Sequence, residues 1–157
     1  MLDLHGLLKA RFASVRQDLD EALNGFTDSD LTWSPGAGMR TVAGQILEIA
    51  DKDREAVIWM KTGVWPDGEP ASFDPETITL DQARTALATI RLTTLAYIDS
   101  MTEAELEMPV QCPEAWWEAL RLTECPRSEV LRNIAAHEWY HTGQLYTYRC
   151  LRTGLMN

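Results

Sequence analysis

Apolar residues recur every three or four positions through four stretches of the chain, and this spacing predicts four amphipathic helices. The four stretches cover residues 4–23, 41–62, 80–101 and 128–153. A glycine closes the first, second and fourth stretches, as is common where a helix ends. Hydroxyl side chains suited to N-capping stand at the start of the later three, at Thr41, Thr79 and Ser128.

The connections between these stretches are irregular. Asp28-Ser29-Asp30 indicates a short turn, and Thr102 with Glu105 forms a capping-box pattern. Prolines interrupt residues 107–127, and a loop of this length is often functional in a compact domain. No stretch alternates apolar and polar residues convincingly, so we expect no long strands. The pattern predicts an all-α four-helix bundle, with residues 1–157 forming one domain.

Composition narrows the class of protein. The 157 residues are 45% hydrophobic and 24% charged, which is ordinary for a globular protein. The formal net charge of -10 would repel phosphate backbones, so we expect no nucleic-acid partner. The apolar runs are too short to span a membrane, and the N-terminal residues lack the order of a signal peptide. We therefore expect a cytoplasmic protein without a membrane partner.

The sequence His137-Glu138-Trp139-Tyr140-His141 is the main candidate for chemistry. Two histidines four residues apart project from one face of a helix and can meet at one metal ion, although a chance pair is the alternative. The same residues fit the zinc-protease pattern, in which the glutamate activates water. Only 16 residues follow His141 and none is acidic, so the downstream third ligand of such proteases is missing.

Other side chains could complete or support such a site. Glu48 lies close to the apolar positions of its helix, where a carboxylate either needs a partner or reaches water at the edge. Gln144 shares a face with His141, as a substrate contact or as an interhelical hydrogen bond. Glu138 is either a general base or a surface acid, about 100° around the helix from His137. Five tryptophans either wall a pocket or belong to the core: Trp33, Trp59, Trp116, Trp117 and Trp139.

Residues 46–54 and 133–145 resemble the two motif regions of the DinB/YfiT-like superfamily of helical-bundle metalloproteins. The connector at residues 31–35 and the Gly143-Gln144 pair after the second histidine are similar as well. The resemblance implies three metal ligands, usually all histidines, which fall here on Glu48, His137 and His141. Glutamate in place of the usual histidine leaves the metal open between zinc, nickel and iron. A member that has lost its metal is the alternative.

The resemblance also implies a class of activity. Some members of the superfamily transfer groups to a low-molecular-weight thiol such as mycothiol or bacillithiol, and others are considered hydrolases. We therefore expect a metal-dependent enzyme that activates a bound thiol or water and acts on a small-molecule substrate, and a homodimer is compatible with this. The alternative is a non-catalytic, stress-related or ligand-binding bundle whose metal is structural or lost.

Overall fold

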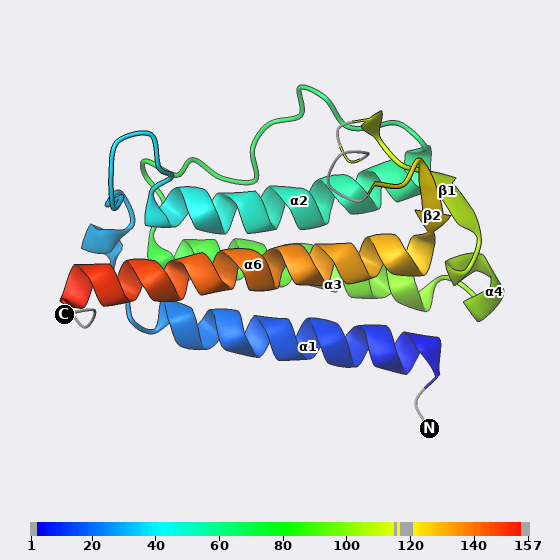
Figure 1. The fold of residues 1–157 in the computed structure, drawn as a ribbon, viewed down its shortest axis with the longest axis horizontal. Helices are drawn as coiled ribbons and strands as arrows, with labels where there is room; N and C mark the ends of the chain where they lie inside the picture. Colours follow the sequence, from blue (N-terminus) through cyan, green and yellow to red (C-terminus); the bar gives the residue numbers. More distant parts are fainter. Residues whose placement is uncertain (1–2, 115, 117–120, 155–157) are drawn as a thin grey trace.

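The computed structural model describes residues 3–114, 116 and 121–154. Four long helices lie side by side as a bundle, and they confirm the all-α fold expected from the hydrophobic pattern (Figure 1). They are α1 (Leu4–Leu23), α2 (Val42–Thr62), α3 (Leu80–Asp99) and α6 (Arg127–Thr153).

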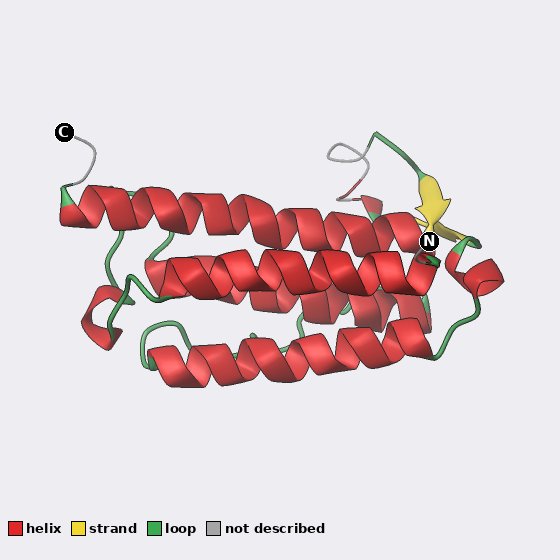
Figure 2. Cartoon of the chain, turned by 90° about the horizontal axis from the view of Figure 1, so that it is seen from below, coloured by secondary structure: helices red, strands yellow, loops and turns green. Residues whose placement is uncertain are grey.

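The chain direction in the bundle follows from one long crossover. The segment between α2 and α3 passes back along the length of α2, so that these two helices run in the same direction (Figures 1 and 2). α1 and α6 run the opposite way. The main helix contacts are α1 with α6, α2 with α3 and α2 with α6. The terminal helix therefore packs against both α1 and α2, which places its histidines beside α2.

The short elements lie at the two ends of the bundle. A 3-10 turn at Asp28–Asp30, as expected, lies at one end, and α4 (Glu103–Leu106) lies at the other. A small antiparallel hairpin next to α4 pairs β1 (Pro109–Gln111) with β2 (Glu124–Pro126), with Val110 opposite Cys125. The sequence pattern did not predict this hairpin, because strands of three residues are too short to show an alternating pattern.

The predicted caps are confirmed in all but one case. Thr41 accepts a hydrogen bond from the Gly44 amide, and Thr79 and Thr102 each close a capping box. The prediction for Ser128 was wrong. α6 begins one residue earlier, without a side-chain cap, and the Ser128 hydroxyl donates instead to the Glu107 carboxylate at 2.9 Å.

The buried interior has two apolar clusters, one toward each end of the bundle. One contains Phe12, Trp59 and Leu131, and the other contains Leu19, Ile46 and Leu145. Buried polar groups need hydrogen-bond partners, and eight polar or charged side chains are buried as well in the part of the chain that the structure describes. They are Gln45, Asp53, Arg91, Thr94, Ser128, Glu138, His141 and Thr142. Among the described residues, no helix has the length and apolar character needed to cross a membrane.

Candidate metal centre

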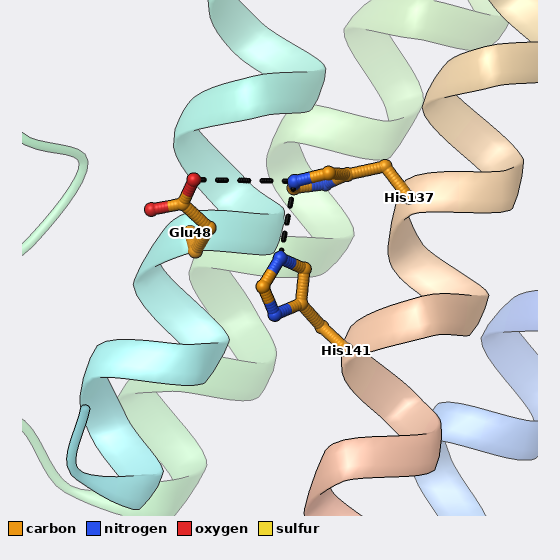
Figure 3. Close-up of side chains that lie close together, drawn as sticks. All are labelled: Glu48, His137 and His141. Carbon is orange, nitrogen blue, oxygen red and sulfur yellow. Dashed lines mark hydrogen bonds and ion pairs between the residues drawn. The ribbon is translucent and has the colours of Figure 1, made fainter. Parts of the chain in front are cut away.

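Glu48, His137 and His141 meet between α2 and α6, as Figure 3 shows. The two histidines lie one turn apart on α6, and their Nε2 atoms face each other at 3.1 Å. A carboxylate oxygen of Glu48, from α2, lies 3.9 Å from Nε2 of His137. One donor atom from each side chain lies within 4.8 Å of the other two. The structure thus brings together the three residues that the resemblance implied as ligands.

A chain of hydrogen bonds determines which nitrogen of His141 carries the proton. The Tyr148 hydroxyl donates to the backbone carbonyl of Arg40 at 3.1 Å, and this carbonyl can only accept. The hydroxyl therefore accepts from the amide nitrogen of Gln45 at 3.0 Å. The amide oxygen of Gln45 must then face Nδ1 of His141, at 2.5 Å. His141 consequently carries its proton on Nδ1 and presents the Nε2 lone pair to the site.

The carboxylate of Glu48 is held in place from the opposite side. Arg40, just before α2, contacts the second carboxylate oxygen at 2.9 Å and leaves the first oxygen directed toward His137. Glu48 is neither fully buried nor free in water, since 38% of its side chain is exposed. The His137 side chain is 20% exposed. Solvent therefore reaches the Glu48 side of the cluster, while His141 is buried.

Burial keeps both imidazoles neutral. Desolvation, with smaller effects from His141, Lys52 and Arg40, lowers the pKa of His137 to about 3. Burial also lowers the pKa of His141, although the nearby Glu48 carboxylate opposes this shift. Neutral imidazole is the form that binds a metal ion, so the histidines need not lose protons first.

The spacing of the donor atoms suits one metal ion. Two ligands bound tetrahedrally to zinc at about 2.0–2.1 Å lie about 3.3 Å from each other. The imidazole nitrogens are close to that separation. Glu48 lies 3.9 Å from His137 and within 4.8 Å of His141, so its half-exposed side chain would need to approach by roughly 0.5–1.5 Å. Two histidines and a carboxylate suit zinc and also iron or nickel. The donor set and its geometry therefore fit a divalent ion.

The two candidate catalytic residues, Gln144 and Glu138, lie in different surroundings. Gln144 lies one turn beyond His141, and its amide oxygen is buried without a hydrogen-bond partner among the described residues. Glu138 is not a surface acid, because only 1% of its side chain is exposed. Both of its carboxylate oxygens accept hydrogen bonds from Arg16, and one of them also from Arg91. The Glu138 carboxylate is therefore part of a buried ionic cluster, and its role as a general base stays a prediction.

The expected tryptophans are split between core and surface. Trp59 and Trp116 are buried, Trp33 is half-buried, and Trp139 is 63% exposed on α6. Trp117 lies outside the described residues. Which of these tryptophans are buried could not be read from spacing, because burial depends on how loops and helices pack against one another.

A second group of possible ligands is engaged in local structure. Asp3, His5 and Glu103 have donor atoms within 4.8 Å of one another where α1 begins. Asp3 accepts from the Gly6 amide, Glu103 accepts from the Leu4 amide, and the His5 ring contacts the Met101 carbonyl at 2.7 Å. The Asp3 bond caps α1, the Glu103 bond joins α1 to α4, and the His5 contact joins α1 to the residues just before α4, so we assign the group no metal.

Sequence reasoning did not single out the supporting residues Arg40, Gln45, Lys52 and Tyr148. Helical spacing indicates that two of them share a face with the ligands, since Gln45 lies one turn before Glu48 and Tyr148 lies two turns after His141. Glutamine and tyrosine are common at helix interfaces, however, and only the packing of α2 against α6 shows that they touch.

The fold and the site together define a helical-bundle protein with a candidate divalent-metal centre built from two of its helices. The family model of the DinB superfamily matches residues 11–145, and the chain belongs to this superfamily. The match includes all three candidate ligands. A search of curated proteins finds no match to the chain.

Proposed function

We propose that this protein is a metal-dependent enzyme in which Glu48, His137 and His141 hold one divalent ion of zinc, nickel or iron. One observation carries the proposal: two neutral imidazole nitrogens lie 3.1 Å apart, with a carboxylate from a second helix next to them. In the metal-free protein His137 can donate a hydrogen bond from its Nε2 to Nε2 of His141, and a divalent ion bound to both nitrogens would take the place of that proton.

The surrounding residues prepare the ligands. Gln45 fixes the tautomer of His141, Tyr148 fixes the amide of Gln45, and Arg40 orients Glu48. Outer contacts of this kind hold metal ligands in productive orientations. A divalent ion in such a site acts as a Lewis acid and lowers the pKa of a coordinated thiol or water.

Catalysis is favoured over a purely structural ion by the number of protein ligands. Structural zinc sites are normally closed by four side chains, whereas catalytic sites keep a position open. Within the described residues, the group around Glu48 contains only three potential ligands, and its outer side is reached by solvent. The proposed reaction is transfer of a group to a low-molecular-weight thiol, or hydrolysis, with a small molecule as substrate.

The first test is metal content after reconstitution with Zn²⁺, Ni²⁺ or, without oxygen, Fe²⁺. We expect one ion per chain in the unmodified protein, none in His141→Ala, and at least tenfold weaker binding in Glu48→Ala. His5→Ala is the matched control, because His5 is the histidine outside the centre and should leave binding unchanged. Failure of all three metals to bind the unmodified protein would contradict the proposal.

The second test measures catalytic activity. Metal-loaded and chelated protein would be compared for conjugation of monobromobimane with cysteine, glutathione, mycothiol or bacillithiol, and for hydrolysis of aryl esters. We expect metal-dependent turnover in one of the two assays. A loaded protein without turnover in either would favour the non-catalytic bundle.

A further inference from the structure

Lys52 lies one turn beyond Glu48 on α2, on the same side of the helix as the metal centre. Four residues of α-helix advance about 6 Å, so its position is next to the cluster rather than within it. Its ammonium group lies 4.2 Å from the ring centre of Trp116 and 5.4 Å from that of Trp65. The two indoles come from different connections and pack edge to face at 5.5 Å. They form an aromatic wall beside Lys52.

The ammonium group has no counter-ion within the described residues. No carboxylate lies within 4 Å of it, and no hydrogen bond to it is formed there. The nearest acids are engaged elsewhere, Glu48 with Arg40 and Glu55 near Arg54. Indole faces attract a cation but leave its three N–H donors unsatisfied.

The other lysines of the chain behave differently. Lys9 forms an ion pair with Asp99, and Lys61 is exposed. Lys52 is partly buried without an ion pair among the described residues, and burial lowers its pKa while Glu48 and Glu55 partly offset this. A cation in such surroundings gains from an anionic partner, since desolvation is costly when a charge is unpaired.

A metal ion on Glu48 would increase this need. The carboxylate that favours the charged form of Lys52 would then be shared with a divalent cation. Arg40 and Lys52 would both lie near that cation, so the positive charges around the centre would exceed the single negative charge of Glu48. An incoming anion would supply it. One ammonium between two indoles suits a carboxylate on an aromatic or apolar body, whereas phosphate sites usually offer more donors.

We propose that Lys52, Trp65 and Trp116 form a subsite that binds the carboxylate of an aromatic or apolar small molecule beside the metal centre. Its role as part of the substrate site rests on the function proposed above, but binding of the anion requires no metal. Trp116 is the residue of the irregular connection between α3 and α6 that contributes to this subsite.

The test compares two probes of nearly equal shape, phenylacetate and phenylacetamide, by calorimetric titration of zinc-loaded protein. We expect roughly tenfold tighter binding of the carboxylate, about 1.4 kcal/mol. The ratio of the two affinities should fall to nearly one in Lys52→Met, which keeps the apolar stem of the side chain. The ratio should persist in Lys52→Arg, which keeps the charge. Lys61→Met is the control, because Lys61 lies on the same helix over an aromatic ring, Tyr97, at 5.5 Å.

Two outcomes would overturn the subsite. One is an unmodified protein that shows no preference for the carboxylate. The other is an undiminished preference in Lys52→Met, which would mean that the anion is recognised by another group, such as the zinc ion. Metal content is measured in every variant, and the titrations are repeated on chelated protein. A Lys52-dependent preference without any metal binding would retain the subsite and reject the proposed function.

Discussion

The orientation of the His141 ring depends on a single amide group. Gln45 can face the ring with its oxygen or its nitrogen, and only the first arrangement leaves the Nε2 lone pair free. The Tyr148 hydroxyl determines which way the amide faces. It donates its hydrogen bond to the Arg40 carbonyl, so it can only accept one from the amide nitrogen of Gln45. The metal centre is thus organised by residues that do not themselves bind the ion.

Replacing Gln45 tests this chain of contacts. Gln45→Leu removes the acceptor of the His141 Nδ1 proton, and we expect zinc affinity to fall about 10- to 100-fold. Tyr148→Phe should have a smaller effect in the same direction, since Gln45 stays but can turn. Competition with a chromophoric chelator measures both. Gln17→Leu, at an exposed position of α1, is the control, and an equal loss there would point to a general effect on folding.

The candidate ligands could be identified before the structure, whereas their supports could not. His137 and His141 stand out because helical spacing alone places them together, and the resemblance added Glu48. The partners of Gln45 and Lys52 depend on how α2 meets α6 and two loops. For Glu138 the surface-acid alternative was wrong, because spacing along one helix cannot show its buried ion pairs with Arg16 and Arg91.

At the scale of elements, local chemistry determines where helices begin. Thr41, Thr79 and Thr102 cap their helices as expected, since the contact joins residues only three apart. The start of α6 was misplaced because Ser128 has a distant partner, Glu107. Short-range interactions can be read from sequence, but a competing long-range one cannot.

The contribution of the turn at Asp28–Asp30 to stability should depend on pH. Asp30 accepts hydrogen bonds from the Thr27 hydroxyl and amide, and these bonds, together with Arg152, lower its pKa. The unfolded chain therefore binds more protons as the pH falls below about 4, where the contribution of Asp30 to stability is lost. Above that pH the contribution is fully present.

We expect Asp30→Asn to lower the free energy of unfolding by about 1 kcal/mol at pH 7. The difference from the unmodified protein should shrink at pH 3. Urea titrations at the two pH values measure it. Asp67→Asn serves as the control, because Asp67 is exposed and its side chain forms no hydrogen bond or ion pair in the described structure. A difference that stays constant with pH would argue against the charged cap.

At the scale of the whole molecule, one buried ionic network joins all four long helices between the two apolar clusters. Arg91 on α3 bonds to Asp53 on α2, to Glu138 on α6 and to the carbonyl of Phe12 on α1. Arg16 completes the network from α1. Because hydrogen bonds between charged groups are directional, we expect these contacts to favour one register of the four helices.

Removing Arg91 should therefore affect the whole bundle. Arg91→Met leaves Asp53 without its arginine and Glu138 with Arg16 alone, and we expect a loss of about 3–5 kcal/mol in the free energy of unfolding. Adding Asp53→Leu removes the stranded carboxylate and should recover a large part of the loss, since apolar replacement of a buried pair is often nearly neutral.

Urea denaturation of the two variants measures this, with Arg84→Met as the control for losing an arginine. Arg84 pairs with Asp20 at the surface, and its loss should cost under about 1 kcal/mol. If the double variant is less stable than Arg91→Met, Asp53 contributes to the bundle without its arginine, through Thr94, and charge balance does not explain the network. If it is more stable, most of the cost of Arg91→Met lies in the unpaired carboxylate of Asp53.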